Sequence, residues 1–233
     1  MNINKENSLL NHKTVYDLTP FTHLDFPNHL ACIVWMTGCN MRCDYCYNKD
    51  IVFSKEGKLS PNEVLSFLKK RVGLLDGVVL SGGEATGHNL IPFCKQRKKL
   101  GFKIKLDTNG TNYEQIKSLV ELNLLDYIAL DYKAPQYKFN EITHSNQFNL
   151  FSKSLDLLIT SSIEFEVRTT VHNDLLNVDD INAIIGDLLK RAYNKTYYLQ
   201  EFLNTEENIG NISKPSNLFD KSLLLNTIDI IWR

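Results

Sequence analysis

The sequence lacks both a long hydrophobic run and an excess of charge of either sign. Apolar stretches such as residues 223–232 are interrupted by Asn226 and Asp229, well below the roughly 20 apolar residues that a membrane helix needs. The 26 Lys and Arg nearly balance the 27 Asp and Glu, so charge gives no reason to expect nucleic acid or an anionic membrane as a partner. Residues 1–8 are polar and no apolar export signal follows them, which predicts a cytoplasmic protein.

The sequence also lacks internal repeats, low-complexity tracts and Pro/Gly-rich linkers that would mark a domain boundary. A chain of 233 residues is long enough to bury one sizeable core. We therefore expect a single domain over residues 1–233, with a core barrel at about 16–201 and a C-terminal extension at 202–233.

Short β-rich runs alternate with helical patterns along the chain, which predicts parallel βα units. The expected fold is α/β, a partial (β/α)6 barrel similar to a TIM barrel. Ser60, Pro61 and Glu63 form a capping-box pattern that predicts a helix start. The alternating segment 102–107 is expected near a sheet edge, residues 204–216 as a surface loop, and the residues from 217 as a terminal helix. The expected strands are 31–37, 77–80, 102–107, 125–131, 164–171 and 196–201, and the other expected helices are 88–100, 113–122, 148–160 and 178–193.

Three of the five cysteines, Cys39, Cys43 and Cys46, fall within eight residues directly after the first expected strand. Active sites of βα folds are built at that end of the strands. Three thiolates are one fewer than a four-iron cluster ordinarily takes, and an open iron can bind a substrate. The alternative is a zinc site with Cys32, His88 or His172 as fourth ligand, although none has the usual paired spacing.

The spacing Cys-x3-Cys-x-aromatic-Cys resembles the signature of the radical S-adenosylmethionine (SAM) superfamily. The resemblance implies that the three thiolates bind a [4Fe-4S] cluster and that SAM chelates the open iron. It also implies that Tyr45 lies against the adenine. Cys32 and Cys94 are expected to be buried thiols, so no second cluster is expected.

The second expected strand ends in Ser81-Gly82-Gly83-Glu84. The two glycines permit close approach of the backbone to a ligand, and the glutamate offers an acceptor for a cation. Taken alone, the segment is an ordinary turn. It resembles the Gly-Gly-Glu motif of the superfamily, which implies that Gly82, Gly83 and Glu84 receive the SAM ammonium group. Ala85 stands where these proteins commonly have proline.

Two carboxylates and a lysine follow the next two expected strands, in Asp107-Thr108-Asn109-Gly110 and Asp131-Tyr132-Lys133. We expect them to converge on one rim of the barrel, although each is by itself a common turn or a solvated pair. They resemble segments of glycyl-radical-enzyme activating enzymes, which implies that they bind the ribose and carboxylate of SAM. The cofactor contacts expected from these segments are Asp107, Asn109, Asp131 and Lys133. Asp107, Thr108 and Asp131 also resemble a monovalent cation site of that group.

Arg168 and His172 are four residues apart on the fifth expected strand, and strict alternation would place both on one face. If that face is the interior, we expect both to bind the cofactor, with Arg168 pairing with its carboxylate. The alternative is an outward-pointing Arg168 and a His172 that merely ends the strand.

Residues 20–27, together with residues 32–46, resemble the short activating proteins of anaerobic ribonucleoside-triphosphate reductase. The resemblance implies reductive cleavage of SAM, followed by hydrogen abstraction from a glycine of a partner glycyl radical enzyme. It also implies a flavodoxin- or ferredoxin-type electron donor. The absence of further cysteine pairs agrees with an activase that has no inserted ferredoxin-like domain. The alternative is a small-molecule enzyme that resembles 7-carboxy-7-deazaguanine synthase.

Overall fold

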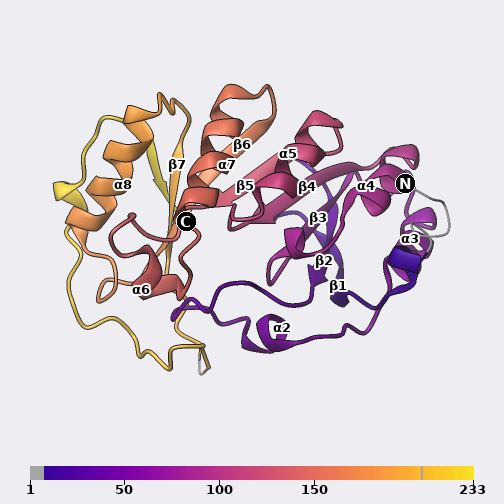
Figure 1. The fold of residues 1–233 in the computed structure, drawn as a ribbon, viewed down its shortest axis with the longest axis horizontal. Helices are drawn as coiled ribbons and strands as arrows, with labels where there is room; N and C mark the ends of the chain where they lie inside the picture. The colour runs from indigo at the N-terminus through magenta and orange to yellow at the C-terminus, as the bar shows by residue number, and fades with distance from the viewer. Residues whose placement is uncertain (1–7, 206) are drawn as a thin grey trace. The chain divides into compact units, whose positions relative to one another are not determined.

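The computed structural model describes residues 8–205 and 207–233 and consists of two compact units. Unit 1 comprises residues up to Asn40, Asp50–Thr108 and Glu114–Ile128, and unit 2 comprises Met41–Lys49, Asn109–Tyr113 and Ala129–Arg233. Across the sheet, the strands of the described residues follow one another in the order in which they occur in the chain, and Figure 1 labels them up to β7. Strand β5 (Tyr127–Asp131) contributes residues to both units.

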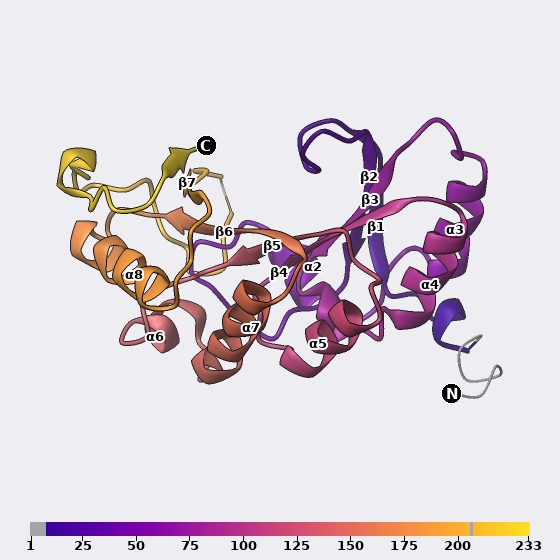
Figure 2. The same cartoon turned by 90° about the horizontal axis from the view of Figure 1, so that it is seen from above.

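Unit 1 is built on β1 (Val15–Thr22), β2 (Ala31–Met36), β3 (Gly77–Gly82) and β4 (Lys103–Thr108). Strands β2 to β4 are parallel, as expected, while β1 pairs with β2 antiparallel. The helices of this unit are α2 (Lys49–Phe53), α3 (Pro61–Lys69), α4 (Ile91–Lys99) and α5 (Tyr113–Glu121). Figure 2 shows α3 and α4 beside the strands of this unit. The predicted capping box of α3 is present, with Ser60 and Glu63 bonded to each other's backbone N–H.

Unit 2 contains the parallel strands β6 (Glu164–Val171), β7 (Tyr197–Glu201) and β8 (Ile230–Trp232). Its helices are α6 (Phe139–Thr143), α7 (Phe148–Thr160) and α8 (Val178–Lys190). An Asn177 capping box begins α8. The bounds of β6 and α7 are those that the sequence predicts.

Two expectations about the strands and the C-terminus are wrong. Strand β4 lies between β3 and β5 and not near an edge, because its polar Lys105 is buried by pairing with Asp107 and does not face water. The residues from 217 form a short 3-10 turn (Lys221–Leu223) and β8 instead of a terminal helix, since β8 completes the hydrogen bonding of β7. The expected loop at 204–216 has no helix or strand in its described residues, and residue 206 lies outside them.

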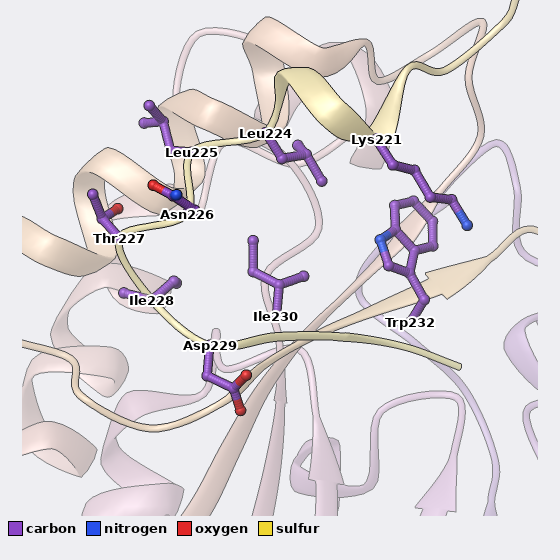
Figure 3. Close-up of a pocket in the computed structure, with 9 residues that line it drawn as sticks. All are labelled: Lys221, Leu224, Leu225, Asn226, Thr227, Ile228, Asp229, Ile230 and Trp232. Carbon is purple, nitrogen blue, oxygen red and sulfur yellow. The ribbon is translucent and has the colours of Figure 1, made fainter.

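The C-terminal segment also forms a shallow, solvent-open pocket between the 3-10 turn and β8 (Figure 3). The apolar side chains of Leu224, Ile228 and Ile230 line it, and the ammonium group of Lys221 lies 3.8 Å from the ring centre of Trp232. No helix in the described part of the chain is long and apolar enough to span a membrane.

Candidate active site

The segment of residues 38–46, which we call the cysteine loop, follows β2. It begins at Gly38, whose φ of +74° lies in the left-handed region that glycine adopts without steric cost. Cys39 belongs to unit 1, and Cys43 and Cys46 belong to unit 2. None of the three forms a disulfide; Cys43 is buried, and the other two are partly exposed. The Cys46 N–H donates to the Cys43 carbonyl at 3.0 Å, which closes a turn between these two.

The donor set of this loop fits an iron-sulfur cluster. No disulfide engages its three cysteines, and cysteine thiolates are the ligands that hold such clusters. Among residues 8–205 and 207–233, no three His, Cys, Asp or Glu side chains are arranged to hold a single metal ion.

In unit 1, the Gly82-Gly83-Glu84 segment lies directly against the start of the cysteine loop. The Glu84 N–H donates to the Gly38 carbonyl at 2.8 Å. A Cβ atom on Gly83 would lie 1.9 Å from that same carbonyl oxygen, a separation no two such atoms can adopt. A Cβ atom on Gly82 would lie 2.4 Å from the backbone nitrogen of Met36 in β2. Gly83 therefore permits close approach to the protein's own cysteine loop and Gly82 to β2, and their roles toward the cofactor stay predictions.

The carboxylate of Glu84 is buried, with 3% of the residue exposed. Its Oε1 atom accepts hydrogen bonds from the Thr86 N–H at 3.1 Å, the Thr86 hydroxyl at 2.6 Å and the Thr108 hydroxyl at 2.7 Å. Three hydrogen bonds to one oxygen fix the orientation of this carboxyl group. A carboxyl group held in place just after β3 is suited to a cationic ligand.

Asp107 lies at the end of β4 and Asn109 follows that strand, and the side chains of both are held by hydrogen bonds or ion pairs. Asp107 contacts the buried Lys105 at 2.6 Å and accepts from the Ser81 hydroxyl at 3.0 Å. Asn109 Oδ1 accepts from the Thr111 N–H and hydroxyl, at 3.0 and 2.7 Å, which is the local turn that its sequence favours. The cation site predicted at Asp107, Thr108 and Asp131 stays a prediction.

In unit 2, Asp131 forms ion pairs with Lys133 at 2.9 Å and with Arg168 at 2.5 Å. Burial raises the pKa of Asp131, but the charges of Arg168 and Lys133 outweigh burial and hold this pKa at about 2. Arg168 therefore lies at the end of β5, and its expected role toward the cofactor stays a prediction.

Tyr45 lies beside this charged group. The Lys133 ammonium is 5.9 Å from the Tyr45 ring centre, within the range of a cation–π contact. The Tyr45 hydroxyl is buried without a hydrogen-bond partner in the described residues, and burial raises its pKa well above the usual value. A buried hydroxyl normally finds a partner, so this atom is a natural contact for a bound ligand.

His172 lies just beyond β6 and contacts the C-terminal segment. Its Nε2 is 2.8 Å from the Ser213 carbonyl, and its ring packs edge-on against Phe202 with ring centres 4.7 Å apart. Arg168 and His172 thus have different neighbours, and the role of His172 toward the cofactor stays a prediction.

Replacement of Asp131 by Asn is expected to remove part of the pH dependence of stability. The pKa of Asp131 in the folded state is below the unfolded value of about 3.9. The ionised Asp131 therefore stabilises the fold above about pH 4, and this stabilisation is lost as the pH falls toward 2. The variant should lose on the order of 3 kcal/mol at pH 7, since two cations are left without their carboxylate. Urea unfolding at several pH values measures both effects; equal losses at pH 7 and pH 2.5 would contradict the pairing.

The structure also places residues that the sequence did not single out. His144 Nε2 contacts Asp44 Oδ1 at 2.8 Å, and the backbone N–H groups of Ile209 and Gly210 donate to the cysteine loop. The only signal for these contacts in the sequence is the turn-forming pattern Asn208-Ile209-Gly210-Asn211.

A family model described as the radical SAM superfamily matches residues 33–188. A protein of Methanocaldococcus jannaschii, named provisionally as a glycyl-radical enzyme activating enzyme, is 26% identical over 92% of this chain and 96% of its own. The pyruvate formate-lyase-activating enzyme of Clostridium pasteurianum is 36% identical, but over only 42% of this chain and 46% of its own.

Two further matches concern other chemistry or the fold alone. The 7-carboxy-7-deazaguanine synthase of Buchnera aphidicola is 23% identical over 72% of this chain and 86% of its own. The solved structure of native anSMEcpe with bound AdoMet superposes with a TM-score of 0.60 at 19% identity, over 74% of this chain and 52% of that one. This likeness supports the partial TIM-like α/β fold.

Proposed function

The chain belongs to the radical SAM superfamily, and we propose that it activates a glycyl radical enzyme, anaerobic ribonucleoside-triphosphate reductase. Its cofactors are a [4Fe-4S] cluster and SAM. The observation that carries the proposal is the relative from Methanocaldococcus jannaschii, which aligns over almost the whole length of both chains.

Cys39, Cys43 and Cys46 are the proposed ligands of the cluster. When bound and reduced, the cluster supplies the electron that cleaves SAM and starts hydrogen abstraction. The protein's task is to orient SAM and exclude water. We assign the positioning of the SAM ammonium group to the buried, three-times-bonded carboxylate of Glu84.

The remaining contacts are proposed on the same basis. Arg168 and Lys133 lie at Asp131 and are suited to the SAM carboxylate and ribose, and Tyr45 offers its ring and its unpartnered hydroxyl to the adenine side. The electron donor is proposed to be of the flavodoxin or ferredoxin type, and the cytoplasm is the proposed location. Nucleic acid and membranes are not proposed as partners, given the net charge of -1.

Replacement of Glu84 by Gln is expected to weaken SAM binding. The amide keeps the size of the side chain but removes the charge that attracts an ammonium group, and a hydrogen bond to a charged group contributes about 1.5–3 kcal/mol. The dissociation constant for SAM should therefore rise roughly 10- to 100-fold. Equilibrium binding to the reconstituted protein measures it, with Glu56→Gln as an exposed control. An unchanged constant would remove Glu84 from the SAM site.

The proposed activity is tested by mixing the anaerobically reconstituted protein, a reductant and SAM with a candidate reductase and recording the electron paramagnetic resonance (EPR) spectrum. We expect a glycyl radical doublet that is absent when the reductase carries alanine at its target glycine. Absence of the doublet with every such partner would refute the activase proposal.

A second candidate is a small-molecule enzyme of the 7-carboxy-7-deazaguanine synthase type. It is favoured by the relative from Buchnera aphidicola, whose similarity covers 72% of this chain and 86% of its own. Formation of 7-carboxy-7-deazaguanine by the reconstituted protein, without any partner polypeptide, would favour this candidate over the activase.

A further inference from the structure

The second half of the cysteine loop, residues 42–46, has neither helix nor strand. Its shape must therefore come from its neighbours, which on one side are the last residues of α6. The Arg42 N–H donates to the Thr143 carbonyl at 2.9 Å, and the Asp44 N–H donates to the Ile142 carbonyl at 3.2 Å. These bonds fix the N–H groups of one edge of the loop.

The carbonyl groups of the same loop accept hydrogen bonds from the C-terminal segment. The Gly210 N–H donates to the Asp44 carbonyl at 2.9 Å, and the Ile209 N–H donates to the Cys46 carbonyl at 3.0 Å. The loop is thus held between α6 and residues 208–212, which we call the clamp turn. All of these residues belong to unit 2.

The clamp turn is closed by the side chain of Asn208. Its amide donates to the Ile212 carbonyl and its oxygen accepts from the Ile212 N–H, both at 2.8 Å. Asn208 is 2% exposed, although it lies in a segment rich in exposed polar residues. A buried asparagine whose bonds all close one turn fixes the direction of the neighbouring N–H groups.

Gly210 allows the clamp turn to reach the loop. A Cβ atom at this position would lie 2.6 Å from the Cβ and 2.8 Å from the Cα of Asp44. The second of these is a backbone atom, so a larger residue displaces either the turn or the loop between Cys43 and Cys46. Gly210 does not have a positive φ. Glycine is therefore required at this position by the lack of space for a side chain and not by the backbone conformation.

We propose that the clamp turn is a positioning element that sets the geometry of Cys43 and Cys46 for the cluster. The inference rests on the proposed role of these cysteines as ligands. Partners that orient metal ligands influence affinity and electronic properties of a metal site, and loops need such support to hold ligands accurately. The clamp turn, which lies more than 160 residues after the loop in sequence, supplies it through backbone hydrogen bonds.

The first test needs no cluster. Hydrogen–deuterium exchange of the apo-protein is measured for peptides covering residues 40–48, in Gly210→Ala and Asn208→Ala. The clamp bonds are accepted by loop carbonyls, so their loss acts on exchange in this loop through greater opening of the loop. That opening exposes the Arg42 and Asp44 N–H groups, which donate to α6, and should speed their exchange about tenfold. Gly186→Ala and Asn226→Ala are matched controls, because a Cβ atom on Gly186 meets nothing within 4 Å and Asn226 is exposed. Both controls should exchange like the wild type.

The second test uses the reconstituted proteins. We expect Gly210→Ala to retain its melting temperature within a few degrees but to show an altered EPR line shape of the reduced cluster, in both the presence and absence of SAM. Wild-type exchange in residues 40–48 together with a wild-type spectrum in both variants would overturn the proposal. A wild-type protein that binds no four-iron cluster would instead refute the assignment of the cysteines as ligands. The exchange measurement is independent of that assignment, because it is made on the apo-protein.

Discussion

Replacement of Cys43 by alanine is expected to abolish SAM cleavage, with no 5'-deoxyadenosine formed above background. The remaining two thiols do not suffice for a cluster that already lacks one of its ordinary four ligands. The backbone turn from Cys43 to Cys46 uses the Cys43 carbonyl, which alanine retains, so the loop itself should persist. Anaerobic reconstitution followed by iron and sulfide analysis and product quantification measures the effect.

Cys94→Ala is the matched control for this variant. Cys94 is a buried free thiol on α4, and its removal leaves the cysteine loop untouched. It should bind wild-type amounts of iron and cleave SAM normally. Formation of 5'-deoxyadenosine by the Cys43→Ala protein would contradict the assignment of the cysteine loop.

Replacement of Gly83 by alanine should have the second large effect. The new methyl group would meet the Gly38 carbonyl oxygen at 1.9 Å and the Gly38 carbonyl carbon at 2.6 Å. Gly38 is itself tied to the Ile51 carbonyl through its N–H at 2.8 Å, so the strain passes to Cys39. Displacement of a reacting group by about 1 Å can cost on the order of 100-fold in rate, and we expect a loss of that size in SAM cleavage.

Gly87→Ala separates this clash from a general effect of replacing a glycine near the motif. A Cβ atom on Gly87 meets nothing within 4 Å. Its rate of SAM cleavage should remain close to that of the wild type. Equal losses in Gly83→Ala and Gly87→Ala would show that the contact between Gly83 and Gly38 has no particular importance.

The sequence predicted the parallel strands and most long helices because those elements carry periodic apolar patterns. It did not predict β1, whose strand Val15–Thr22 contains Pro20 and several exposed residues and is defined by its pairing with β2. The three-residue β8 is likewise defined by β7. Such elements depend on partners distant in the chain, which local patterns do not reveal.

For the candidate site, too, the sequence indicated features that depend on local motifs and missed those that depend on distant partners. Short motifs indicated the cysteines, Glu84 and Asp131, because their chemistry depends on residue type and spacing. Motifs did not indicate that Glu84 is held by Thr108 or that Asp131 is shared between Lys133 and Arg168. The clamp turn was least visible, because it acts through backbone N–H groups that every residue except proline carries.

Isotope transfer tests the central claim of hydrogen abstraction from a glycine most directly. The partner reductase is prepared with deuterium on the Cα atoms of its glycines and is mixed with the reduced protein and SAM, and the 5'-deoxyadenosine formed is analysed by mass spectrometry. The proposed function predicts that deuterium moves from the partner into 5'-deoxyadenosine as the glycyl radical signal grows. In this labelled partner the signal should be a singlet, because deuterium replaces the α-hydrogen whose coupling produces the doublet. Product that contains only protium while the radical signal forms would contradict the proposed function.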